Sequence, residues 1–208
     1  MPTVNVLYND RQLPSFLAAC IAVLLSLALF TVLTSKNGTP IGIYDNGIGD
    51  HWVPGHRDLT IVDRTGDPGW NQALAAAVAT WGAGGSALNL TLVKGDGACG
   101  QHRDHVEVCL ASTHQISGQG TAGEQGLFVP AVGRHNDYHS AILLVCSDCE
   151  IDEDRATVIA THELGHALGL AHSPDPLSVM YYLGGSAQPD ARDYQDLRLL
   201  EGVALTRT

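Results

Sequence analysis

Short apolar segments recur along the chain from residue 59 onward, and their pattern predicts strands. Leu88–Leu92 and His105–Leu110 alternate apolar and polar residues, as a half-buried strand does, because its successive side chains point to opposite faces. Three further apolar runs are also assigned to strands: Leu59–Val62, Leu127–Val132 and Ser140–Val145. The pattern therefore predicts a sheet of about five strands.

Three other segments predict helices. The first begins at Asp67-Pro68 and runs to about Trp81, with Asp suited to the cap and Pro to the first turn. The second covers about 153–170 and has acidic residues at its positive end. The last covers about 191–200. An order of strand, helix, several strands and two helices, without internal repeats, predicts an α+β fold.

The N-terminal part is apolar on all sides. The run from Phe16 to Leu33 carries no charge and is short for a membrane span but long for a signal-peptide core. Residues 1–36 are therefore expected to be a cleaved signal peptide or a signal-anchor helix. We favour the anchor slightly, because no A-x-A-like cleavage site follows. Residues 37–57, rich in Gly, Pro, Asp and Asn, are expected to be a linker, and 58–208 the folded domain.

Either interpretation places the domain outside the cytoplasm, secreted or membrane-anchored, and the cysteines agree. Four follow the apolar run, and an even number in an exported domain predicts two disulfides. Proximity favours Cys99–Cys109 and Cys146–Cys149. Cys146-x-x-Cys149 could instead be a redox pair or half of a zinc site. However, no second C-x-x-C completes such a site, and the βαβ context of a thioredoxin-like protein is missing.

The charge excludes one class of partner. The formal net charge is -11, with 11 Lys and Arg residues in total. Nucleic-acid binding requires a basic face, so no nucleic acid is expected as a partner. The same balance argues against anionic membrane surfaces as partners of the folded domain, which leaves the N-terminal apolar helix, if it is not cleaved, as the predicted membrane contact.

The segment 161–173, THELGHALGLAHS, carries the candidate chemistry. His162 and His166 are four residues apart on a predicted helix, so both rings project from one face. Gly169 stands where the helix should end, and the chain can then bring His172 back as a third nitrogen ligand. Three protein ligands leave a fourth zinc position for water, as in catalytic sites. Glu163 lies beside the first ligand and is the expected general base.

The extended pattern H-E-x-x-H-x-x-G-x-x-H resembles the metzincin zinc endopeptidases. Met180 in Ser178–Tyr182 resembles their Met-containing turn, and Ser173 resembles the matrixin branch, peptidase family M10. The closing segment 193–202 also resembles the matrixins. The resemblance implies a metzincin-like domain with a twisted, mostly parallel sheet, an active-site helix and a C-terminal helix. It also implies zinc-dependent hydrolysis of peptide bonds in extracellular proteins.

Tyr182 departs from the matrixin pattern, which usually has Pro there. It is similar to a Tyr of astacins and serralysins that can reach the zinc, which makes Tyr182 a second candidate catalytic residue. By analogy with the clan, the substrate is expected to lie extended along 126–130. Leu177 and Val179 indicate an apolar pocket for the residue after the cut.

Other metal sites have weaker support. Matrixins hold a second, structural zinc, but the spacing of the histidines between 102 and 139 does not match that pattern. We interpret them as surface residues: His102, His105, His114, His135 and His139. No segment singles out a Ca²⁺ site. The alternative function is a catalytically silent, membrane-tethered zinc-binding module, against which the intact Glu163 argues.

Overall fold

The computed structural model describes residues 51–52, 58–84, 88–117, 125–132 and 137–206. By its contacts the chain divides into two compact units, Met1–Ile41 and Gly42–Thr208, and all described residues belong to the second. The expected signal or anchor segment lies outside them. Within the described ranges, no helix combines the length and the apolar character needed to cross a membrane.

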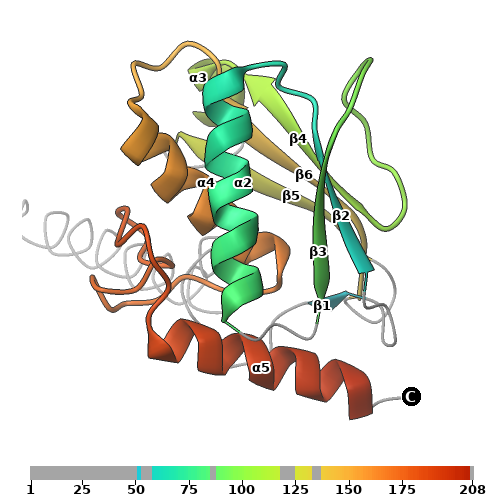
Figure 1. The fold of residues 1–208 in the computed structure, drawn as a ribbon, viewed down its shortest axis with the longest axis vertical. Helices are drawn as coiled ribbons and strands as arrows, with labels where there is room; N and C mark the ends of the chain where they lie inside the picture. The colour runs from blue at the N-terminus through green and yellow to red at the C-terminus, as the bar shows by residue number, and fades with distance from the viewer. Residues whose placement is uncertain (1–50, 53–57, 85–87, 118–124, 133–136, 207–208) are drawn as a thin grey trace, which may run out of the picture. The chain divides into compact units, whose positions relative to one another are not determined.

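A six-stranded sheet forms one layer of the second unit (Figure 1). Its strands are β1 (His51–Trp52), β2 (Asp58–Asp63), β3 (Asn89–Lys94), β4 (His105–Ala111), β5 (Gly126–Val132) and β6 (Asp137–Cys146). The order is β1-β6-β4-β2-β3, and β5 pairs with β6. All pairs are parallel except β5 with β6, which is antiparallel. The predicted mostly parallel sheet is confirmed.

Four helices complete the described fold: α2 (Pro68–Ala83), α3 (Thr113–Ser117), α4 (Glu153–Ala167) and α5 (Ala191–Thr206). Helices α2 and α4 lie side by side against one face of the sheet (Figure 1). The predicted starts of α2 and α4 are confirmed. Asp67 Oδ1 accepts hydrogen bonds from the backbone N–H groups of Gly69 and Trp70, and Asp152 caps α4. The short helix α3 was not predicted from the sequence.

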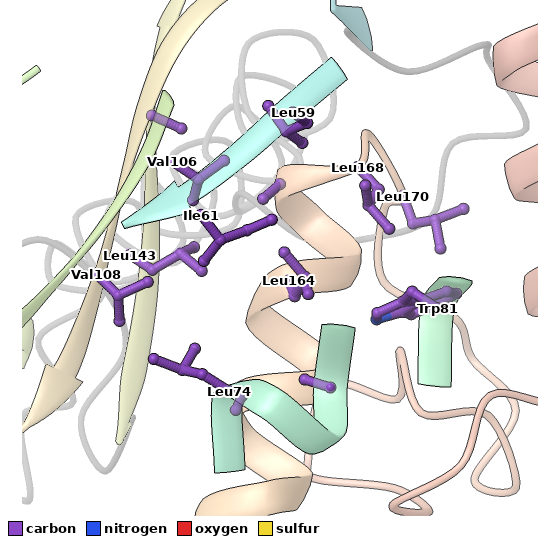
Figure 2. Packing of buried hydrophobic residues seen from close by; sticks show 14 of the residues in the cluster. Leu59, Ile61, Leu74, Trp81, Val106, Val108, Leu143, Leu164, Leu168 and Leu170 are labelled. Carbon is purple, nitrogen blue, oxygen red and sulfur yellow. The ribbon is translucent and has the colours of Figure 1, made fainter. Parts of the chain in front are cut away.

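The hydrophobic core lies between the sheet and the two packed helices. Figure 2 shows Ile61, Val106 and Leu143 of the sheet facing Leu74 of α2 and Leu164 of α4. Burial of each large apolar side chain stabilises the fold by about 1.5–3 kcal/mol. Trp81 adds a polar link, because its indole N–H donates to the carbonyl of Thr161, at 2.9 Å. This contact fixes α2 against the helix that carries the histidine motif.

The position of Trp52 corrects the prediction that residues 37–57 are a linker. Its side chain is buried, its indole N–H donates to the carbonyl of Ala167 at 2.7 Å, and its ring meets Tyr138 edge to face. The linker interpretation of 37–57 was therefore wrong at this point, and the folded domain begins before residue 58. The rest of that segment, apart from His51 in β1, lies outside the described residues. A single buried anchor among Gly and Pro residues leaves no periodic pattern that could predict it.

Both predicted disulfides are present. Cys99 and Cys109 are joined with their Cα atoms 6.1 Å apart, and Cys146 and Cys149 with theirs 5.7 Å apart. These distances are usual for disulfides. The second disulfide lies at the end of β6, directly before the segment that caps α4. It therefore constrains the entry into the helix that carries His162.

Candidate active site

Three histidines meet where α4 ends and the chain turns back. His162 and His166 come from α4, and His172 from the segment that follows. One ring nitrogen of each lies within 4.8 Å of those of the other two. The Nε2 atom of His162 is 3.1 Å from that of His172 and 3.2 Å from that of His166. The structure therefore brings together all three histidines that the sequence predicted.

Hydrogen bonds orient two of these rings. His162 Nδ1 lies 2.7 Å from the carbonyl oxygen of Val179, and His166 Nδ1 lies 2.7 Å from that of Leu170. A carbonyl only accepts, so each Nδ1 carries the hydrogen and donates it. Each neutral ring then has only a lone pair at Nε2. Two such lone pairs cannot hydrogen-bond to each other, so their close approach favours a shared cation.

Burial keeps these rings neutral. It lowers the pKa of His162 to about 4, against the opposing hydrogen bond to Val179 and with help from the charge of His172. Burial, with the neighbouring His162 and His172, lowers the pKa of His166 well below its ordinary value. Metal ligation requires the neutral imidazole. The orientation and the neutral state both fit a zinc ion, for which imidazole nitrogen is a preferred ligand.

Glu163 lies beside the histidines and against the edge of the sheet. Its side chain is buried. A Cβ atom added at Gly126 would lie 2.7 Å from both Cγ and Oε1 of Glu163, so any other residue there would displace the Glu163 side chain. Phe128 stacks on His166 with ring centroids 6.4 Å apart. Strand β5 therefore runs along the histidine cluster, and Glu163 touches its first residue.

Met180 lies under α4. Its side chain is buried and occupies the space that a side chain at Gly165 would need, together with Trp81, whose Cζ2 would be 2.9 Å from an added Cβ. The carbonyl of Met180 accepts a hydrogen bond from the backbone N–H of Ser173, at 2.8 Å. The turn is thus connected both to the helix and to the residue after His172.

Asp193 holds this turn, a role that the sequence analysis missed. It is buried at the start of α5. Its carboxylate accepts hydrogen bonds from the hydroxyl of Ser178, at 2.6 Å, and the backbone N–H of Val179, at 3.2 Å. Burial raises the pKa of Asp193, and the bond from Ser178 opposes that shift. The same Val179 orients His162 through its carbonyl. The only sequence signal was an Asp in the matrixin-like closing segment.

Tyr182 is not brought to the histidines. Its side chain is 58% exposed, and its ring lies against Tyr181 with centroids 4.8 Å apart. Among the described side chains, the histidine rings contact one another and Phe128 instead. The expected apolar pocket also needs a correction, because Val179 is fully buried in the core and only Leu177 is exposed. Sequence position alone did not reveal this, because Val179 packs in a core built from distant segments of the chain.

Two histidines of the predicted surface group lie beside a buried carboxylate away from the three-histidine cluster. His102 Nδ1 lies 2.9 Å and His105 Nδ1 lies 3.6 Å from Oε1 of the buried Glu107. Arg64 donates to the same carboxylate. His114 is exposed, His139 is partly buried, and His135 lies outside the described residues. Apart from the histidine cluster, one described group has metal-ligand geometry, Cys146, Asp148 and Cys149, but its sulfurs form a disulfide.

Comparison with known proteins identifies the family. A family model described as matrixin, peptidase M10, matches residues 71–197. The chain belongs to the matrixin family. This family consists of metalloendopeptidases, and it is the metzincin branch that Ser173 and the closing segment 193–202 resembled. Matrilysin from Felis catus is 54% identical over 44 residues, which are 21% of this chain and 15% of the relative. The matched segment thus spans a small part of that protein.

Two solved structures of myroilysin are also similar. One matches with a TM-score of 0.48 and 14% identity, over 76% of this chain and 88% of its own. The other has a TM-score of 0.46 and 14% identity, over 83% and 90% of the two chains.

Proposed function

We propose that this protein is a zinc-dependent endopeptidase that hydrolyses proteins outside the cytoplasm. One observation carries the proposal: three partly buried imidazoles, two of them held neutral by carbonyl partners, point their Nε2 atoms at a common centre beside a buried carboxylate. Membership of the matrixin family supports it.

The histidines are the proposed ligands of one zinc ion. When bound by His162, His166 and His172, zinc supplies a Lewis acid that polarises the scissile carbonyl and lowers the pKa of water to about 7. The carbonyls of Val179 and Leu170 keep the ligand rings in the required tautomer. No described residue points to a second structural zinc or to Ca²⁺, and we propose neither.

Glu163 is the proposed general base. It takes a proton from the attacking water and delivers it to the leaving amine. Its contact with Gly126 places the carboxylate at the start of β5. Within the described part of the chain, β5 pairs with β6 alone, so its other edge can pair with an extended peptide. Such a substrate would run past both Glu163 and the histidine cluster.

Tyr182 is kept as a second proposed catalytic residue, acting on the developing oxyanion. Its exposed ring follows directly on the turn of Met180, so rotation of the side chain would be required. Tyr182→Phe should then lower kcat and leave KM unchanged. An unchanged kcat would make it a surface residue.

The disulfides and the apolar N-terminal run support the proposed location of the catalytic domain outside the cytoplasm. Disulfides persist in oxidising compartments, and the run from Phe16 to Leu33 would direct export. We propose that residues 1–36 are a signal peptide or a signal anchor. If they are an anchor, the membrane is a partner of the protein. We also propose that the catalytic domain begins before Trp52.

Glu163→Gln tests the reaction. The variant should retain zinc, measured by elemental analysis, and lose hydrolysis of casein by about 10²–10⁴-fold, the usual contribution of a general base. Full activity of this variant would refute the mechanism. A wild-type chain that binds zinc but cleaves nothing would instead support the silent zinc-binding module.

A further inference from the structure

We propose that Arg155 is a specificity determinant that binds a carboxylate of the substrate beside the histidine cluster. The proposal rests on the proposed endopeptidase function and adds a preference that neither the motif nor the family model assigns. The carboxylate is that of an Asp or Glu side chain or of a peptide C-terminus.

Arg155 shares a helix face with the zinc ligands. It precedes His162 by seven residues on α4, which is two helical turns and about 10 Å along the axis. Seven residues bring a side chain back to the same face. Arg155 therefore lies on the side of α4 that carries the ligand histidines, two turns toward the N-terminus of the helix.

The guanidinium group also connects the two segments that border the site. Its Nε donates to the side-chain oxygen of Gln125, at 2.9 Å. Gln125 directly precedes Gly126, which touches Glu163. On the other side, Nη1 of Arg155 lies 2.7 Å from the position that a Cβ of Gly184 would take. Arg155 thus spans from the start of β5 to the segment that follows Tyr182.

Gly184 keeps room for this arrangement. Its φ is +83°, in the left-handed region that favours glycine, and its N–H donates to the carbonyl of Tyr181 at 3.0 Å. A side chain there would collide with the guanidinium. The turn after Met180 therefore ends in a residue whose conformation and small size both accommodate Arg155.

Among the residues that the structure describes, no carboxylate pairs with Arg155. Among the described ion pairs, carboxylates pair with Arg64, Arg192 and two histidines, but none with Arg155. The nearby Asp152 accepts the backbone N–H of Arg155 and not its guanidinium. The side chain is exposed. In a chain with a net charge of -11, this cation beside the site has only an amide oxygen as its described partner.

The hydrogen-bond donors and the positive charge of Arg155 fit a carboxylate as the ligand. With Nε used by Gln125, the two terminal nitrogens still offer donors, and a guanidinium binds a carboxylate through parallel charge-assisted hydrogen bonds. A peptide paired with the free edge of β5 would carry some of its side chains past Gln125 and toward Arg155. An acidic side chain at that position gains a partner, and a basic one meets a like charge.

The test uses the zinc-loaded full chain and internally quenched peptides that differ only in Glu, Gln, Ala or Lys at single positions around the cleavage site. A second set compares free and amidated C-termini. We expect one position at which Glu exceeds Gln by about tenfold in kcat/KM. Arg155→Gln should abolish that ratio, and Arg155→Glu should reverse it in favour of Lys. Arg192→Gln, which removes a surface cation from α5, is the matched control and should keep the wild-type ratio.

The outcomes separate the alternatives. If only the free C-terminus is favoured and Arg155→Gln removes that advantage, the carboxylate is terminal. Equal loss of kcat/KM for all peptides in Arg155→Gln, with a lower melting temperature, would make Arg155 a structural brace to Gln125 and overturn the proposal. An unchanged Glu to Gln ratio in the variants would also overturn it. Failure of the wild-type chain to cleave any peptide would overturn the proposed function itself, on which this assignment rests.

Discussion

Replacement of Asp193 by Ala should weaken both the fold and the metal site. The carboxylate holds Ser178 and Val179, and the carbonyl of Val179 in turn fixes His162. Asp193 is buried, so its loss leaves the Ser178 hydroxyl and the Val179 N–H without their acceptor.

The magnitude follows from these two donors. Each buried donor left unsatisfied costs about 1–3 kcal/mol. The two together should lower the free energy of unfolding by about 2–6 kcal/mol, less whatever water entering the cavity restores. Loss of support to a ligand histidine weakens metal binding by about 10–100-fold. The fold and the zinc affinity should therefore change together.

Two measurements check this prediction. Urea unfolding of the zinc-free chain gives the stability, and competition with a chelator gives the zinc Kd. Asp196→Ala is the matched control, since Asp196 is on the same helix and faces Arg192 at 3.8 Å. A partly exposed pair of this kind contributes about 0–1 kcal/mol. If Asp193→Ala matched this control in both stability and zinc affinity, the assigned role of Asp193 would be refuted.

Two further predictions concern the packing beneath α4 and a buried carboxylate of the sheet. Gly165→Ala should destabilise the protein by about 1–3 kcal/mol in urea unfolding, because its methyl group meets Met180 and Trp81. Gly82→Ala is the control, because a Cβ atom there meets nothing within 4 Å, and it should cost no stability. An equal loss of unfolding free energy in the two variants would contradict the packing argument. Burial alone would raise the pKa of Glu107, but Arg64 and His102 lower it below 4.5. Its contribution is therefore full above that pH and lost as the pH falls through the lowered pKa. Wild-type stability, measured against Glu107→Gln, should show this loss, and a constant difference down to pH 2 would contradict it.

The sequence predicted the centre of the site because the motif is local. His162, Glu163 and His166 lie on one helix, so their relative positions follow from its period. Gly169 ends the helix with a φ of 102°, as its place in the motif indicated. His172 follows a few residues later, and the disulfides join cysteines close in sequence.

The features that the sequence did not predict depend on contacts between distant segments of the chain. Asp193 reaches the Met180 turn only because α5 packs there, and Arg155 meets Gly184 only through the course of the chain after Met180. The position of β4 between β6 and β2 reflects long-range pairing that alternation does not encode. Val179 was assigned to a pocket because its sequence neighbours alone do not show which face is covered.

A zinc titration of the metal-free full chain, with peptide hydrolysis followed at each step, tests the central claim most directly. The account predicts that activity rises in proportion to added zinc, saturates at one equivalent, and is absent at every zinc concentration in His172→Ala. Hydrolysis that persists in the metal-free chain, or that is unaffected by the loss of His172, would contradict it.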